Sequence, residues 1–173
     1  NNVLRSLNAP DVTAAERREK FQQYMEEFSN LDAVARFVIG KYSRQFSEEE
    51  LERYVAAFRT YALAVYEFYF NEYKGQAVEV TGSLDRNARD SIVDTTIMRA
   101  DGEALTVRWR VLKRNDAYQV VDIALSADGQ LIWLAIEQQA QFLSILNQNN
   151  GSADALIEKI ESMTDELVAM RDE

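Results

Sequence analysis

Apolar residues recur at intervals of three and four in the first part of the chain, which is the spacing of an amphipathic helix. Thr13 with Glu16, and Ser47 with Glu50, have the spacing of capping boxes, in which side chains bind the free amides at a helix start. Glycines at 40 and 75 follow two of the apolar patterns, as expected at helix ends. This part of the sequence therefore predicts helices at about residues 13–28, 31–40 and 47–73.

The spacing changes to every second position after residue 77, which is typical of a half-buried β-strand. Alternating segments at 78–81, 92–98, 105–111 and 118–125 are separated by turn-forming pairs, Asp101-Gly102 and Asn115-Asp116. Successive short strands joined by tight turns form an antiparallel meander. The sequence thus predicts an α+β fold in which a twisted antiparallel sheet of about four strands is packed by N- and C-terminal helices.

Helical spacing returns from about Gly129, and a polar turn at 147–151 leads to a last helix capped by Ser152. From Ser152 onward, seven acidic and two basic side chains account for half of the net charge of −10. Packing of this helix on the body and binding of a partner are both consistent with its narrow apolar stripe. We expect one domain over residues 1–173, with a flexible leader at 1–11 and an acidic C-terminal helix at 152–173 that is partly an extension.

The composition is that of an ordinary folded domain and excludes several kinds of chemistry. The 173 residues carry 19 basic and 29 acidic side chains, which argues against nucleic-acid binding and against docking by charge alone on anionic lipid. The chain has no cysteine and no histidine. Thiolate sites, histidine-ligated zinc and Ser-His-Asp triads are therefore excluded.

One carboxylate has the position of a buried acid or base. Asp122 lies between two apolar residues in a predicted strand, and the alternative to a catalytic role is an outward side chain bound to Arg108 or Arg110. The acidic residues at 48–50, and Asp90 with Asp94, are better explained by a helix start and by an exposed strand face than by a metal site. No glycine-rich phosphate loop is present, and we expect no metal, no cofactor and no assembled catalytic site.

The second half of the long helix is aromatic on more than one face, so it is either a central core helix or the wall of an apolar cavity. Together with apolar strand positions, it supplies nine predicted wall residues of such a cavity, chosen from the periodicity. These are Tyr61, Val65, Phe68, Tyr69, Ile97, Val107, Trp109, Ile123 and Phe142.

The order of several short motifs resembles the MlaC-like family, also called toluene-tolerance proteins. The similarity runs from about Phe28 to Ile160, and Tyr118 stands where the family has Trp. The stretch from Asp122 to Phe142 is about one helical turn longer than in the family. The motifs that carry the resemblance are residues 35–42, Ser47 with the helix through Phe58 and Tyr66, Val93-Asp94-Thr95, residues 118–123, Gln141-Phe142, and Gly151 with Leu156-Ile157.

The resemblance implies a periplasmic phospholipid carrier that has no enzymatic activity. Its partners would be an inner-membrane MCE/ABC transporter complex and an outer-membrane lipoprotein complex, with a role in the lipid asymmetry of the outer membrane. Acyl chains would lie in an apolar cavity between sheet and helices. We find no signal-peptide pattern at Asn1 and expect the chain to be a mature periplasmic form.

Two other functions stay open on the residues alone. The first is an enzyme or binder of a small apolar ligand that uses Asp122 as its polar group. The second is an interaction protein with a solid core, whose acidic C-terminal helix binds a partner.

Overall fold

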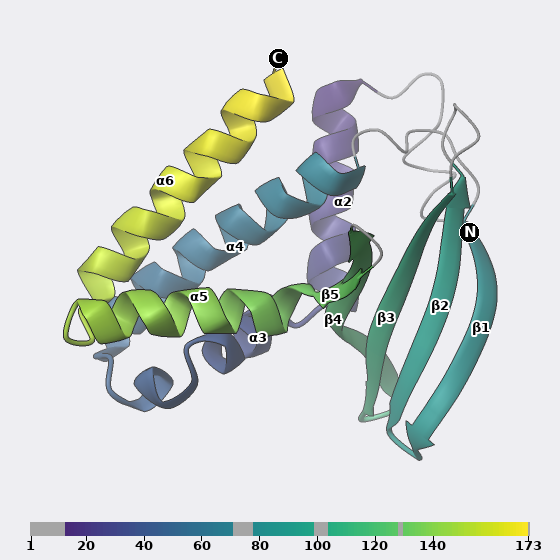
Figure 1. The fold of residues 1–173 in the computed structure, drawn as a ribbon, viewed down its shortest axis with the longest axis horizontal. Helices are drawn as coiled ribbons and strands as arrows, with labels where there is room; N and C mark the ends of the chain where they lie inside the picture. Colours follow the sequence, from purple (N-terminus) through teal and green to yellow (C-terminus); the bar gives the residue numbers. More distant parts are fainter. Residues whose placement is uncertain (1–12, 71–77, 99–103, 128–129, 173) are drawn as a thin grey trace. The chain divides into compact units, whose positions relative to one another are not determined.

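The computed structural model describes residues 13–70, 78–98, 104–127 and 130–172 (Figure 1). The chain divides into two compact units, each described here by itself. Residues 1–30 and 72–134 form the first, which we call the sheet unit, and residues 31–71 and 135–173 form the second, the helical unit. The predicted leader at 1–11 lies outside the described residues.

The first helix of the sheet unit, α2 (Ala14–Phe28), begins at the predicted capping box. The backbone N–H of Glu16 donates to Thr13 Oγ1 at 3.2 Å, and the Thr13 N–H donates to the Glu16 carboxylate at 2.9 Å. At the other end, the rings of Tyr24 and Phe28 stack with centroids 6.3 Å apart. Ser29 then pairs with Val120 in an isolated parallel bridge, which joins the end of this helix to the sheet.

Within the described residues the sheet has five antiparallel strands in sequential order (Figure 1). The α+β prediction is confirmed, but the sheet has one strand more than the four that were predicted. A short strand forms at 130–133, where the helix was expected to have started already from about Gly129, so Leu131 lies in a strand. Pairing of this segment with the preceding strand outweighs its helical spacing. The strands are β1 (Val78–Asn87), β2 (Asp90–Met98), β3 (Ala104–Arg114), β4 (Ala117–Ala127) and β5 (Gln130–Trp133).

The turn between β3 and β4 is the predicted pair Asn115-Asp116, with φ angles of 49° and 61°. Positive φ at both positions is the geometry of the hairpin turn that matches strand twist. One irregularity follows within this hairpin, because the register shifts between Arg110 and Val111. The other predicted turn, Asp101-Gly102, lies outside the described residues.

The helical unit begins with α3 (Leu31–Val38), η1 (Gly40–Arg44) and α4 (Glu48–Phe70). Gly40 ends the first of these helices as predicted, with a φ of +54° that costs glycine little. Ser47 and Glu50 form the second capping box, with backbone-to-side-chain bonds of 2.8 and 3.1 Å. The predicted end of the long helix near Tyr73 and Gly75 lies outside the described residues.

The core of the helical unit is aromatic and closely packed. Tyr54 and Phe58 of α4 are almost wholly buried, and the Tyr54 hydroxyl donates to the Ala35 carbonyl at 2.7 Å. This hydrogen bond removes the cost of burying the hydroxyl and joins α3 to α4. Further along α4, Tyr61, Ala62, Ala64 and Val65 are also buried, so this half of the helix is covered on more than one face, as its sequence predicts.

The remaining helices are α5 (Leu134–Gln148) and α6 (Ala153–Asp172). The predicted turn between them contains Asn150 and Gly151 with positive φ, and Ser152 Oγ accepts from the Ala155 N–H at 3.3 Å. The last helix packs against α4 (Figure 1). Its apolar stripe is buried at Leu156 and Ile160, half-buried at Met163 and Leu167, and exposed at Met170.

Candidate functional site

The sheet has one apolar and one polar face. Side chains alternate between the faces of a strand, and residues directly opposite one another on neighbouring strands share a face. The register places Val107 opposite Thr95 on one side and Leu125 on the other. We call the surface that contains these residues the apolar face. Its central members are Val93, Thr95, Ile97, Leu105, Val107, Trp109, Val111, Ile123 and Leu125.

Four of the nine predicted wall residues come together on this face. Trp109 lies directly opposite Val93 on β2 and Ile123 on β4. Val107 and Ile123 are almost fully buried and Ile97 is 4% exposed, whereas Trp109 is half-buried. The strand alternation was therefore sufficient to assign these four residues to a common surface.

Thr95 places a buried hydroxyl on the apolar face. Thr95 Oγ1 accepts a hydrogen bond from Trp109 Nε1 at 2.8 Å and donates to the Val107 carbonyl at 3.2 Å. The predicted wall residues did not include Thr95, which was noted only as part of a family motif. The available signal was a hydroxyl at an otherwise apolar position of the alternation; its place beside Trp109 follows from the strand register.

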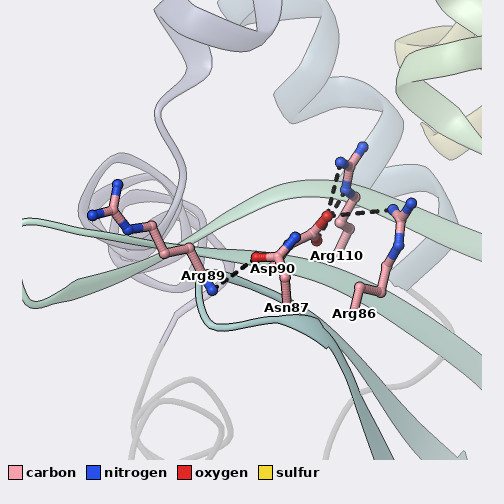
Figure 2. A network of polar contacts seen from close by, with 5 residues as sticks. All are labelled: Arg86, Asn87, Arg89, Asp90 and Arg110. Carbon is pink, nitrogen blue, oxygen red and sulfur yellow. Dashed lines mark hydrogen bonds and ion pairs between the residues drawn. The ribbon is translucent and has the colours of Figure 1, made fainter.

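The opposite face of the sheet carries paired charges. Arg108 binds both carboxylate oxygens of Asp94, at 2.6 and 3.0 Å, and Arg110 binds both oxygens of Asp90, at 3.2 and 3.1 Å. Figure 2 shows the second pair with Arg86, whose guanidinium lies 3.4 Å from the same carboxylate. The hydrogen bonds from these arginines hold the pKa of Asp94 and of Asp90 below the ordinary aspartate value.

Hydrogen bonds in the turn between β1 and β2 hold the charged end of the sheet together. In the hairpin between β1 and β2, the Arg89 backbone N–H donates to Asn87 Oδ1 at 2.9 Å (Figure 2). The Arg89 carbonyl in turn accepts from the Lys113 N–H on β3 at 2.9 Å. The network thus holds the β1–β2 hairpin against the neighbouring strand, which is a structural role.

Asp122, the candidate acid or base, belongs to this charged face. It lies directly opposite Arg110 in the register, and its carboxylate accepts from the Ile123 N–H at 2.8 Å. Because adjacent residues of a strand point to opposite faces, its side chain and that of Ile123 diverge. The carboxylate therefore does not share a surface with Trp109, as an acid or base beside an apolar ligand on that face would.

The other five predicted wall residues belong to the helical unit. Tyr61 and Val65 are buried on α4, and the Tyr61 ring lies 6.1 Å from that of Phe142 on α5. Phe142 is completely buried, and it also contacts the rings of Tyr54 and Phe58 edge to face. Phe68 is 36% exposed. The side chain of Tyr69 lies outside the described part of the structure.

Within the described ranges, no group of three or more acidic side chains is placed to hold a metal ion. No described helix combines the length and hydropathy that a membrane-spanning segment needs. The assembled features are an apolar sheet face with a buried, hydrogen-bonded hydroxyl at Thr95, a charged face of paired arginines and aspartates, and an aromatic helical core.

Comparison with known proteins assigns the chain to a family. No curated protein is significantly similar to it in sequence. Among solved structures, a phospholipid-binding protein from Ralstonia solanacearum, determined in complex with a phospholipid, matches with a TM-score of 0.77 and 18% sequence identity. The match covers 96% of this chain and 92% of that one. The model of the MlaC protein family matches residues 1–162, and the chain belongs to the MlaC family.

Proposed function

We propose that this protein binds phospholipid and carries it through the periplasm. The observation that carries the proposal is the family match over residues 1–162, which includes the whole sheet and most of the helices. The phospholipid bound to the similar protein from Ralstonia solanacearum supports the same ligand class. The apolar sheet face agrees with this role, since acyl chains need apolar contacts and no reacting groups.

The nine predicted wall residues are the proposed acyl-chain contacts. Two acyl chains contain on the order of 30 methylenes, and each contributes about 0.8 kcal/mol when it is removed from water. Contacts with many apolar side chains therefore hold the lipid without any charged anchor. The same arithmetic makes unassisted release into water slow, so delivery requires a partner that receives the lipid.

We infer that those partners are membrane complexes on the two sides of the periplasm. The inner-membrane partner is an MCE/ABC transporter complex and the outer-membrane partner is a lipoprotein complex, as the family resemblance implies. Exchange between them would maintain the lipid asymmetry of the outer membrane. In this role the protein is a carrier and not an enzyme, and Asp122 has a structural function on the charged face of the sheet.

Native mass spectrometry of the full chain purified from a Gram-negative host tests the binding step. We expect a species heavier by about one phospholipid per chain, with the lipid recovered by organic extraction. The measurement is repeated after incubation with vesicles of phosphatidylethanolamine and phosphatidylglycerol. A bare mass in both experiments would overturn the proposal in favour of a solid core or another cargo.

A transfer experiment tests the carrier step separately. Lipid-loaded protein is mixed with proteoliposomes that contain the inner-membrane MCE/ABC complex, and with matched liposomes that lack it. We expect the lipid-bound mass to disappear faster when the complex is present. Equal rates in both samples would leave phospholipid binding intact but contradict the proposed partner.

A further inference from the structure

Trp109 is the largest side chain of the apolar face, and it is also a hydrogen-bond donor. An indole N–H that is covered by hydrocarbon without a partner is costly, because no water can reach it. On this face the indole N–H donates to the Thr95 hydroxyl, which lies diagonally across β2 and β3 and accepts at 2.8 Å.

The Thr95 hydroxyl both donates and accepts a hydrogen bond. It donates to the Val107 carbonyl at 3.2 Å and accepts from the Trp109 indole N–H. The residue is 5% exposed, and it sits between Val93 and Ile97 on the same face of its strand. The relay from indole to hydroxyl to carbonyl therefore leaves no polar hydrogen of these groups pointing out of the apolar face.

We propose that Thr95 is a positioning residue for lipid binding, because it fixes the Trp109 ring and satisfies its N–H whether or not lipid covers the face. This inference rests on the proposed function. The hydroxyl of Thr95 matters more in the lipid-bound protein than in the lipid-free protein. Without this hydroxyl, the lipid-free protein can turn the half-buried indole toward water, whereas the lipid-bound protein cannot.

The removal of the hydroxyl should therefore weaken lipid binding more than it weakens the fold. Thr95→Val keeps the shape and the strand preference of the side chain and removes both hydrogen bonds. Thr95→Ser keeps the hydroxyl and loses a methyl group. The two variants separate the hydrogen bond from the packing of the side chain.

Trp109 can report on its own environment because the chain has only two tryptophans. Trp133 lies opposite Ala124, on the charged face of the sheet. In a Trp133→Phe background, Trp109 is the sole tryptophan, so its emission wavelength reads the indole surroundings. Its quenching by vesicles that contain dibromostearoyl phosphatidylethanolamine reads lipid contact.

We expect Thr95→Val in this background to shift Trp109 emission to longer wavelength before any lipid is added. Half-maximal quenching should then require about tenfold more brominated lipid. Thermal unfolding checks that the variant is folded. Thr95→Ser should remain within about twofold of the parent in lipid demand and keep its emission wavelength.

Unchanged emission and unchanged lipid demand in Thr95→Val would overturn the inference. So would an equal loss of binding in Thr95→Ser, because packing and not the hydroxyl would then be responsible. If the Trp133→Phe parent shows no quenching, the proposed function fails at that point. The lipid-free emission shift still decides whether Thr95 fixes the tryptophan.

Discussion

Asp94 and Arg108 lie directly opposite each other on β2 and β3, and their side chains meet in a two-point ion pair on the charged face of the sheet. The geometry is close to the best that a carboxylate and a guanidinium can reach. Both side chains keep contact with water, with 29% and 41% of their surfaces exposed. Water therefore screens the pair, and its contribution to stability is modest.

Asp94→Asn should lower the free energy of unfolding by about 0.5–1 kcal/mol near neutral pH. It should also change the acid dependence of stability. Arg108 holds the pKa of Asp94 below the ordinary value of 3.8, so near that pH the folded chain binds fewer protons than the unfolded chain. The contribution of Asp94 is complete above about pH 4 and disappears as the pH falls through the lower folded value.

Urea unfolding at a series of pH values measures this effect. Stability of the parent should fall more steeply than that of Asp94→Asn as the pH is lowered below about 4. Asp116→Asn is the matched control. That carboxylate is almost fully exposed, and it lies at a positive-φ turn position that Asn adopts as readily as Asp. Parallel acid profiles for the parent and Asp94→Asn would contradict the prediction.

Asp90→Asn should be more destabilising than Asp94→Asn. The Asp90 side chain is only 10% exposed and accepts two hydrogen bonds from Arg110, with Arg86 nearby (Figure 2). An amide cannot accept at both positions, so a partly buried guanidinium loses a partner at a cost of about 1–3 kcal/mol. The same unfolding experiment at neutral pH compares the two variants, and the reverse order of stability would argue against this account.

Tyr54→Phe should destabilise the helical unit by about 1–3 kcal/mol. The substitution keeps the ring among its aromatic neighbours but leaves the buried Ala35 carbonyl without the hydroxyl that donates to it at 2.7 Å. Tyr118→Phe removes a hydroxyl from a side chain that is 63% exposed, and it should change stability by less than about 0.5 kcal/mol. Equal thermal stabilities for the two variants would show that the buried hydrogen bond contributes little.

Gly151→Ala should be clearly more destabilising than Gly40→Ala, although both glycines have positive φ. A Cβ at Gly151 would lie 2.9 Å from Tyr42 Cε1, whereas at Gly40 the nearest atom is an ordinary contact at 3.9 Å. Gly40→Ala should therefore lower the free energy of unfolding by only about 1–2 kcal/mol, the cost of a positive φ for a residue with a Cβ. In a Tyr42→Ala background the difference between the two glycine substitutions should disappear, and its persistence would exclude the contact with Tyr42 as the cause.

The two tryptophans should respond differently to brominated phospholipid. Trp109 lies on the apolar face with Ile123 opposite it, and Trp133 pairs with Ala124 on the charged face. We expect strong quenching in the protein that retains only Trp109, and weak quenching in Trp109→Phe, which retains only Trp133. Equal quenching of both would mean that the acyl chains do not distinguish the two faces of the sheet.

Local structure could be predicted from the chain alone. Both capping boxes, the Gly40 helix end and the Asn115-Asp116 turn depend on residues within a few positions of one another, and each is present in the structure. The alternation in β2, β3 and β4 likewise assigned Ile97, Val107, Trp109 and Ile123 to one face. Such signals are short in range, so they need no knowledge of the fold.

Only the tertiary structure determined which strands pair and which side chains on different strands contact each other. The segment at 130–133 became a strand because β4 offered it an edge to pair with, and the arginines of β3 took Asp94 and Asp90 as partners because the register brought those carboxylates within reach. Thr95 met the Trp109 indole for the same reason. Each of these contacts joins residues from different strands, and neither spacing nor composition encodes a register. The sequence by itself thus determined the elements and their apolar faces, whereas the pairing of strands determined which side chains act together.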